Sequence, residues 1–333
     1  MTPELSIIIV NWNGGKLLQQ CIESVIRHPP RVSWEIILVD NASADNSLDW
    51  VRARNLSNLR LVENDQNLGF GKANNLAFGL SSAPFLFLLN NDAEVQPGAI
   101  DRLLDTINSG PRVGACGPRI INPDGSLQIS VWRNPLTPWA MVVAALKLYR
   151  LLPRQSGAEL LLGEYWDHSR RRPVNMLLGA AMLVKSQVIA EVGGFDERFH
   201  MYGEDNEWCL RIVRAGWTMI FDPEAVVLHH AGHATGQRWL SRDRQIAKHQ
   251  SAFLYYRISL SWWHNFGNLA VPCVLGVFQL GWRAMRGQSN DDQRLSLTLH
   301  FEELKKLLRG GRRRVLAGEE PPPQATARAS HRD

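Results

Sequence analysis

The chain is poor in cysteine, and its cysteines are not spaced as ligand or disulfide pairs. The 333 residues include four cysteines, all widely separated and without a CxxC pair. This spacing argues against a zinc site and a disulfide framework, and it fits a reducing compartment. The first residues lack the basic segment of a signal peptide, and the apolar run at residues 6–10 is too short for its hydrophobic region. We therefore expect a cytoplasmic protein.

The sequence also lacks a clear membrane span and the signatures of nucleic-acid readers. The formal net charge is +5, with basic clusters at residues 170–172 and 309–314. No recognition-helix or aromatic-sheet pattern accompanies them, so nucleic acid is not an expected partner. The apolar stretch at residues 266–282 has only the lower length of a spanning helix. Because a proline and two amides interrupt it, we expect an interfacial or packed helix.

What the chain does contain is an alternation of strand and helix patterns. Apolar runs predict four strands, at residues 5–10, 35–39, 59–63 and 85–89. Helices are expected between them, at residues 17–26 and 71–80. This order predicts an α/β fold with a mostly parallel sheet and helices on both faces.

The second half predicts a more antiparallel region and then helices. The expected elements are a hairpin at 122–126, an insertion at about 134–174 with a helix at 139–152, strands at 176–184, 218–221 and 225–229, a helix at 204–215, and helices at 254–263 and 266–282.

Polar residues follow the predicted strands of the first half. Asn11 and Asn13 follow the first, Asp40 the second, and Asp92 the fourth. Ligands of open α/β sheets bind beyond the carboxyl ends of the strands, which places these side chains at a site. Asn and Asp also favour turns, and for Asp40 that alternative is equally good on local sequence. The glycine-rich segment at residues 64–75 matches neither the Walker nor the dinucleotide pattern and is weak evidence alone.

Six segments, taken in order, resemble the inverting family 2 glycosyltransferases with the GT-A fold. They are SIIIVNWNG, ILVDNAS, ENDQNLGFGKANN, FLFLLNNDAEV, GGFDERFHMYGEDNEWCLR and VVLHHAGHATG, and they cover roughly residues 5 to 236. The most similar subgroup is the rhamnosyltransferase-like enzymes of bacterial surface-polysaccharide assembly. The resemblance implies a Rossmann-like, mostly parallel mixed sheet flanked by helices, with a helical C-terminal extension.

The domain organisation follows from the same resemblance. Residues 1–240 would form the GT-A domain, with a nucleotide-binding half at 1–110 and an acceptor and catalytic half at 111–240. Residues 241–315 would form an aromatic, membrane-proximal helical extension, and residues 316–333 a disordered tail.

The resemblance assigns a nucleotide pocket and a metal site. Asp40 would contact the base, and Asn90 the ribose. The full set of expected nucleotide-binding residues is Asn11, Asn13, Asp40, Asn67, Gly71, Asn74 and Asn90. Asp92 and His229 would bind Mg²⁺ or Mn²⁺, with His230 and His233 as neighbours that could take the place of His229. A divalent cation stabilises the charge that develops on a departing diphosphate, and a carboxylate is a suitable hard ligand.

The resemblance also assigns the general base to Asp205, with Glu204 as its competitor. An inverting transfer needs one carboxylate to take the proton of the attacking hydroxyl. Both acids would also be favoured in the first turn of a helix by its dipole.

A donor and acceptor pocket is expected around these acids. The residues assigned to it are Gly179, Ala180, Trp208 and Arg211, with Trp132 and Trp166 as further candidates for stacking on the acceptor. Core packing is the alternative for each tryptophan, and a solvated helix position is the alternative for Arg211.

Together these features predict a metal-dependent inverting transferase of rhamnose or a hexose. Its donor would be linked to dTDP or UDP, and its acceptor would be a hydroxyl of a lipid-linked or cell-surface polysaccharide. Peripheral contact with the inner face of the plasma membrane is expected from the aromatic helices and basic clusters. The alternative is a non-catalytic nucleotide-sugar-binding protein that retains the fold. The sequence does not specify the sugar, the linkage or whether the protein forms a homodimer.

Overall fold

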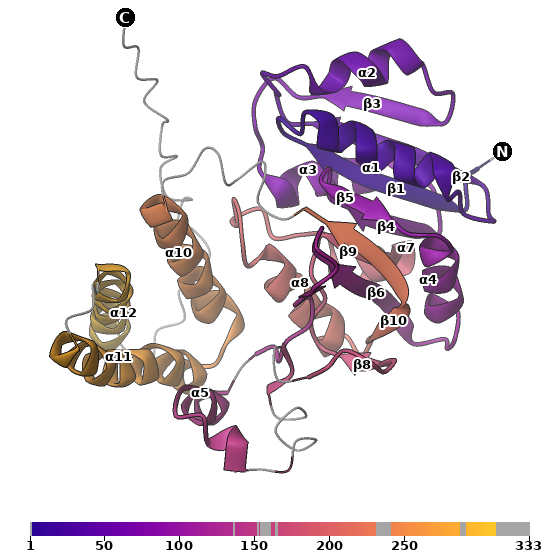
Figure 1. Ribbon diagram of the computed structural model, residues 1–333. Coiled ribbons are helices and arrows are strands. Elements are labelled where there is room, and N and C mark those ends of the chain that lie inside the picture. The colour runs from indigo at the N-terminus through magenta and orange to yellow at the C-terminus, as the bar shows by residue number, and fades with distance from the viewer. Residues whose placement is uncertain are drawn as a thin grey trace, which may run out of the picture.

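The computed structural model of the chain describes residues 2–135, 137–151, 153, 161–163, 166–230, 241–286 and 291–310. Within them, ten strands form one mixed sheet, with the main order β3-β2-β1-β4-β9-β6-β10-β5. Helices cover both faces, and a group of C-terminal helices lies beside the sheet (Figure 1).

The first half of the sheet is parallel, as the sequence predicts. It consists of β3 (Leu59–Glu63), β2 (Trp34–Asp40), β1 (Leu5–Asn11) and β4 (Phe85–Leu89). The register pairs Asn11 with Asp40. The polar residues at these two strand ends therefore lie side by side at the carboxyl edge.

The period of two along these strands divides the core into two layers. In β1, Ile7 and Ile9 belong to one apolar cluster, whereas Ile8 belongs to the other. The first cluster includes buried residues of α1 (Lys16–Arg27), α2 (Ser47–Arg54) and α4 (Ala99–Ile107). Side chains buried on both faces explain why the strands read as continuous apolar runs.

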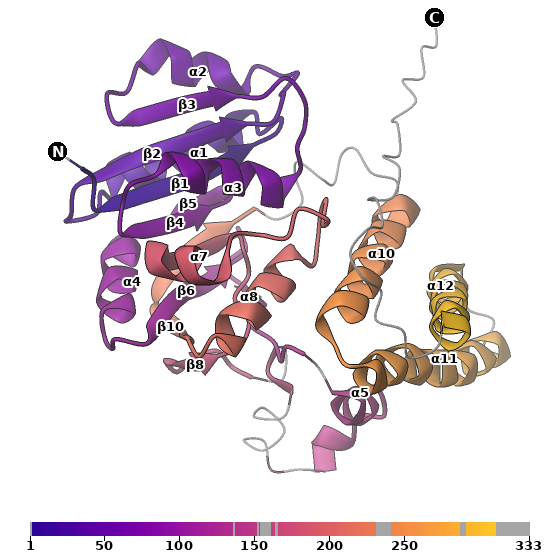
Figure 2. The same cartoon turned by 180° about the vertical axis from the view of Figure 1, so that it is seen from behind.

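The second layer lies on the other face of the sheet, in front of it in Figure 2, and contains α3 (Phe70–Leu80), α7 (Ser186–Val192) and α8 (Glu204–Arg214). Helix α8 carries the two predicted catalytic acids in its first turn.

The second half of the sheet is mostly antiparallel. Its strands are β5 (Ala93–Val95), β6 (Val113–Ile121), β7 (Leu127–Gln128), β8 (Arg172–Val174), β9 (Ala181–Lys185) and β10 (Thr218–His229). Strand β10 is parallel to β6 and antiparallel to β5 and β8. The expected hairpin at 122–126 joins β6 to β7, with the Asn122 amide donating to the Ser126 carbonyl at 2.8 Å.

Two strand predictions were wrong in extent. The segments at 218–221 and 225–229 form one strand, β10, because a register shift between Asp222 and Val226 absorbs the polar residues without ending the pairing. The strand expected at 176–184 is confined to β9, and residues 176–180 are loop. That loop passes the carboxyl edge of β4 and becomes part of the site.

The C-terminal helices form a separate layer beside α8 (Figure 1). They are α10 (Ser241–Ser259), α11 (Trp262–Met285) and α12 (Asp291–Gly310). The expected helix at 139–152 is α5 (Pro138–Ala145) with a 3₁₀ helix at Leu148–Leu151, and α5 packs on α11. The Ser251 hydroxyl donates to the Met201 carbonyl at 2.8 Å, which ties α10 to the segment before α8.

Helix α11 continues through Pro272 and is longer than the predicted segment. Among the described residues, none of the helices combines the length and apolarity needed to cross a membrane. The predicted tail at 316–333 lies outside the described residues.

Candidate active site

The Asn11 side chain connects the ends of three neighbouring strands. Its Nδ2 donates to Asp40 Oδ1 at 2.7 Å, and its Oδ1 accepts from Asn91 Nδ2 at 2.8 Å. Asn11 is fully buried, and Asp40 is 3% exposed. A Cβ on Gly14 would approach Asn11 Oδ1 to 2.5 Å, so glycine is needed beside this cluster. The role of Asn91, which no sequence pattern indicates, is to join the β4 end to β1.

Asp40 and Asn13 hold the loop that follows β2. The Asp40 carboxylate accepts from the Ser43 backbone amide at 2.8 Å and from the Ser43 hydroxyl at 2.6 Å. Asn13 Oδ1 accepts from the Ala44 amide at 2.7 Å. Asn13 Nδ2 is buried and has no hydrogen-bond partner within the described part of the chain. Asp40 thus makes the turn that its sequence favours, and Asn13 keeps an amide donor available for a ligand.

The glycine-rich segment is tied to the same edge through Asn41, whose Nδ2 donates to the Gly69 carbonyl at 3.2 Å. Asn67 Oδ1 accepts from the Gly69 amide at 2.9 Å. A Cβ on Gly71 would lie 3.1 Å from Phe195 Cβ. Asn74 is 2% exposed, and its Nδ2 donates to the Phe70 carbonyl. Gly71 thus packs closely against Phe195, and the Asn74 amide group bonds within its own helix; their assignment to the nucleotide pocket stays a prediction.

Asp92 and His229 lie together at the ends of β4 and β10. His229 Nε2 is 3.1 Å from Asp92 Oδ1 and 3.2 Å from Asn90 Nδ2. On its other side, His229 Nδ1 is 2.7 Å from Gln128 Oε1. Because an amide oxygen only accepts, Nδ1 donates its proton to Gln128, and Nε2 is the ring nitrogen that faces the Asp92 carboxylate and the Asn90 amide.

Asp92 and His229 together suit a divalent cation such as Mn²⁺, because a carboxylate oxygen and an imidazole nitrogen can both act as metal ligands. The described residues contain no group of three or more His, Cys, Asp or Glu that could hold a metal by itself. Further ligands would have to come from the bound diphosphate and water.

The structure also distinguishes the neighbouring histidines. His230 Nε2 is 2.9 Å from Glu94 Oε1, so His230 is directed at a different acid from His229. His233 lies outside the described residues.

Glu204, which is buried, and Asp205, which is half-buried, form a pair of adjacent acids at the start of α8. Asp205 Oδ1 accepts from the Asn206 amide at 2.8 Å, and Oδ2 is 3.5 Å from the Gly179 amide nitrogen. Glu204 is 7% exposed, and its Oε2 is without a partner in the described structure. Burial raises the pKa of Asp205 to about 6, while burial and the neighbouring Asp205 charge raise the pKa of Glu204 to about 8. The two carboxyls titrate as a coupled pair, which therefore keeps a proton to higher pH than two ordinary acids would.

The loop before β9 links this acid pair to the metal candidates. A Cβ on Gly179 would lie 3.7 Å from Asp205 Cβ and 3.4 Å from the Phe70 ring. The carbonyl of the next residue, Ala180, accepts from the Asn90 amide at 2.9 Å. The predicted base, the small-residue segment and the 90–92 segment are thus neighbours in space.

Two residues assigned to the pocket lie elsewhere. Trp208 is fully buried and packs against Phe195 with ring centroids 4.5 Å apart, so it is a core residue. Its large apolar surface, facing the sheet from α8, explains that placement. Arg211 pairs with Glu207 at 2.7 Å and donates to the Gly194 carbonyl, which holds the loop before α8. Trp166 is 8% exposed and stacks on His168, with centroids 4.4 Å apart.

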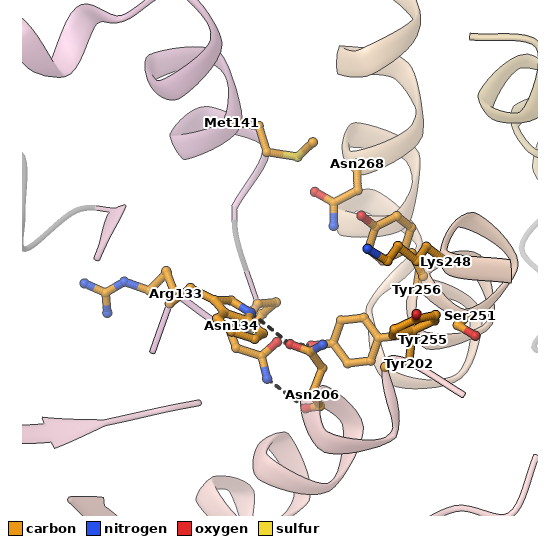
Figure 3. A pocket seen from close by; sticks show the side chains of 14 residues that line it. Arg133, Asn134, Met141, Tyr202, Asn206, Lys248, Ser251, Tyr255, Tyr256 and Asn268 are labelled. Carbon is orange, nitrogen blue, oxygen red and sulfur yellow. Dashed lines mark hydrogen bonds between the residues drawn. The ribbon is translucent and has the colours of Figure 1, made fainter. Parts of the chain in front are cut away.

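A cavity of about 280 Å³ opens beside the start of α8 (Figure 3). Its lining comes from α10, α11, α5, the 132–135 segment and the residues that flank the acid pair. Trp132, a candidate for stacking, does line it, and its Nε1 donates to Asn206 Oδ1 at 3.0 Å.

The acid pair makes a testable contribution to stability. A carboxyl with a raised pKa binds more protons in the folded state, so the free energy of unfolding falls as pH rises from the ordinary value toward the raised one. We expect Glu204→Gln to reduce the loss of stability between pH 5 and pH 8 by roughly 1–3 kcal/mol, since one pKa unit is worth about 1.4 kcal/mol. Urea denaturation at both pH values measures this, with Glu197→Gln as the exposed control. Equal pH dependence in both variants would contradict a raised pKa for Glu204.

The sequence matches the glycosyl transferase family 2 over residues 6–156. The N-acetylglucosaminyl-diphospho-decaprenol L-rhamnosyltransferase of Mycobacterium tuberculosis is 31% identical over 288 residues, which cover 79% of this chain and 87% of the relative. The low-salt glycan biosynthesis hexosyltransferase of Haloferax volcanii is 27% identical and covers 64% of this chain and 63% of the relative.

Two solved structures share the fold. GalNAc-T7 with UDP, GalNAc and Mn²⁺ has a TM-score of 0.52 at 20% identity, over 68% of this chain and 43% of that chain. The mannosyltransferase of Pyrobaculum calidifontis in complex with GDP-Man and Mn²⁺ has a TM-score of 0.52 at 17% identity, over 93% of this chain and 74% of that chain. From the sequence relationship together with this architecture, we conclude that the chain belongs to glycosyl transferase family 2 and has the GT-A fold.

Proposed function

We propose that this glycosyltransferase is an inverting enzyme that moves rhamnose, or a hexose, from a nucleoside diphosphate to a hydroxyl of a lipid-linked acceptor. The observation that carries the proposal is the acid pair Glu204–Asp205, joined through Gly179 and Ala180 to the segment that holds Asp92. The relative named for rhamnosyl transfer to N-acetylglucosaminyl-diphospho-decaprenol aligns over most of its length, which supports this donor and acceptor class.

Asp205 would act as the general base. Its carboxylate takes the proton of the acceptor hydroxyl while that oxygen bonds to the anomeric carbon, and the bond from that carbon to the diphosphate breaks on the opposite face. A pKa raised to about 6 makes this carboxylate a stronger base than an ordinary aspartate while leaving it ionised at neutral pH. A proton kept on Glu204 avoids a second negative charge beside Asp205.

The donor would lie along the carboxyl edge of the parallel strands. Asn13 Nδ2 is a buried donor without a partner among the described residues, and Asn13 Oδ1 bonds to the loop that Asp40 holds. A carbonyl of the nucleotide base would satisfy it. Asn90 and the small residues Gly179 and Ala180 would border the ribose and the donor sugar.

Asp92 and His229 would hold the divalent cation. When bound, the cation offsets the negative charge that develops on the departing diphosphate. The Gln128 side chain would orient the His229 ring for this purpose, because a metal-binding histidine usually donates its other ring N–H to a hydrogen-bond acceptor. Two proteins with the same fold contain Mn²⁺ in their solved structures, which supports this choice of ion.

The C-terminal helices would hold the enzyme on the inner face of the plasma membrane. Helix α11 exposes apolar side chains at helical spacing along one face, namely Trp263, Val274, Val277, Phe278, Trp282 and Met285. Helix α5, which packs on α11, adds Trp139 at 65% exposed. Such a face, with Arg286 at its end, is typical of a helix that lies in the interfacial plane.

The base assignment predicts opposite behaviour of the two acids. We expect Asp205→Asn to lower kcat by roughly 10²–10⁴-fold, the usual contribution of a general base, while the donor still binds. Glu204→Gln should retain most of the activity. The wild-type rate should rise with pH through about 6, where Asp205 ionises. Transfer assays from pH 5 to 9, with donor binding followed by thermal shift, measure these effects.

If Glu204→Gln abolishes transfer and Asp205→Asn keeps it, Glu204 and not Asp205 is the general base. Donor binding by a wild-type protein that transfers no sugar to any acceptor would favour the non-catalytic alternative.

The metal assignment predicts that chelation abolishes transfer. EDTA should remove activity, and Mn²⁺ or Mg²⁺ should restore it. Asp92→Asn and His229→Ala should each weaken Mn²⁺ binding in the presence of nucleoside diphosphate by about tenfold or more, because each removes one ligand. His230→Ala is the matched control, since that side chain contacts Glu94. Titration of Mn²⁺ by electron paramagnetic resonance gives the affinities. Full activity in EDTA would overturn the assignment.

The membrane assignment predicts binding to vesicles. Wild-type protein should cosediment with vesicles that contain phosphatidylglycerol, and the double variant Phe278→Ser, Trp282→Ser should bind several-fold less because it buries less apolar surface. Ile26→Ser, which changes an exposed apolar residue on α1, is the control. Equal binding of the two variants would exclude the α11 face as the contact surface.

A further inference from the structure

The cavity beside α8 is a site that the sequence motifs do not account for. Its 280 Å³ are enclosed mainly by α5, α10, α11 and the residues next to the acid pair. Figure 3 shows that Asn268 from α11 and Met141 from α5 face each other across it.

The cavity contains an unsatisfied hydrogen-bond acceptor. Asn268 is 2% exposed, and its Oδ1 has no hydrogen-bond partner within the residues that the structure describes. A buried amide oxygen without a partner costs about 1–3 kcal/mol, so an occupant that donates an O–H or N–H group would be stabilised there. Asn265, one turn earlier on α11, has the same unpartnered atom but does not line the cavity.

The remaining lining combines aromatic faces with one cation. Trp132, Tyr202, Tyr255 and Tyr256 supply rings suited to the apolar face of a sugar. Lys248 is exposed, and its Nζ lies 5.1 Å from the Tyr202 ring centroid. It forms no ion pair within the described ranges. The Arg133 guanidinium points away from the other labelled side chains (Figure 3). The cavity therefore offers one ammonium group and no carboxylate among its lining residues.

Hydrogen bonds connect the cavity wall to the proposed base. Tyr255 Oη donates to Asn134 Oδ1 at 2.6 Å, and Asn134 Nδ2 donates to the Asn206 carbonyl at 2.7 Å. Asn206 is the residue after Asp205, and its backbone amide donates to the Asp205 carboxylate. An occupant of the cavity would thus lie next to Asp205, the proposed base.

We propose that this cavity binds the sugar–phosphate head of the acceptor, with Asn268 Oδ1 accepting from a hydroxyl or amide N–H of the sugar and Lys248 contacting the phosphate. This assignment rests on the proposed function, because it takes the occupant to be the acceptor of that reaction. The aliphatic chain of the acceptor would leave the cavity along the apolar face of α11. Asn268 and Lys248 are then specificity residues that recognise different parts of one molecule.

Two acceptors separate these contributions. One is N-acetylglucosaminyl diphosphate carrying a short prenyl chain, and the other is octyl N-acetylglucosaminide, which has no phosphate. Asn268→Leu should raise KM for both by about fivefold to tenfold, the effect of one lost hydrogen bond. Lys248→Met should raise KM only for the diphosphate acceptor. The KM for the donor and the rate of donor hydrolysis should stay unchanged in both variants.

The chain offers matched controls for both changes. Asn265→Leu removes the same buried group outside the cavity, and Arg242→Ala removes a cation from the same helix as Lys248; both should leave KM unchanged. An Asn265→Leu effect equal to that of Asn268→Leu would show a helix defect and overturn the assignment. A Lys248→Met effect on both acceptors, or a shift in donor KM, would overturn it as well.

Direct binding keeps this test independent of transfer. N-acetylglucosamine 1-phosphate should quench tryptophan fluorescence, because Trp132 lines the cavity, and Asn268→Leu and Lys248→Met should each weaken that binding. If the wild-type protein transfers no sugar but still binds this probe with the expected loss in both variants, the proposed function fails, while binding of a sugar phosphate in the cavity through Asn268 and Lys248 stands. If the wild-type protein transfers sugar but neither variant changes acceptor binding, the proposed function stands and the cavity assignment fails.

Discussion

The site depends on one buried amide, that of Asn11, at the point where three loops leave the carboxyl edge of the sheet. A fully buried amide must have its hydrogen bonds satisfied, and Asn11 satisfies them by donating to Asp40 and accepting from Asn91. These bonds fix the β2 loop and the β4 loop relative to β1. Gly14 has no side chain because one would collide with this cluster. The position of Asp92, one residue beyond Asn91, follows from the same constraint.

From this edge the arrangement extends to Glu204 and Asp205 through backbone contacts. The Asn90 amide bonds to the Ala180 carbonyl, and the preceding Gly179 amide lies 3.5 Å from the Asp205 carboxylate. A Cβ on Gly179 would make ordinary van der Waals contact with the Phe70 ring and Asp205, so this loop packs directly against both. A diphosphate held near Asp92 and a hydroxyl held near Asp205 would consequently be placed on opposite sides of one sugar. The proposed acceptor cavity adjoins this arrangement at Asn206, the residue after Asp205.

The sequence predicted the parallel half of the sheet closely, since strands buried on both faces are continuous apolar runs. It predicted β10 as two strands because Asp222 and its neighbours read as a break, whereas the pairing with β6 tolerates a register shift there. Trp208 and Arg211 follow the catalytic acids in the sequence, which suggested a pocket role for both. The turn of α8 directs Trp208 into the core, and Arg211 toward Glu207 and the preceding loop. Residue type alone does not distinguish these directions.

The sequence by itself determined the α/β fold, the family and the set of acids and histidines available for chemistry, because these depend on local pattern and on the order of motifs. The tertiary structure decided which of those residues meet. It paired His229 with Asp92 and His230 with Glu94, although the two histidines are adjacent in the chain. It also buried Glu204 beside Asp205, which sets their protonation, and it assembled the Asn268 cavity from segments more than one hundred residues apart. Contacts between distant segments and the burial that they produce are properties of packing, which local sequence does not encode.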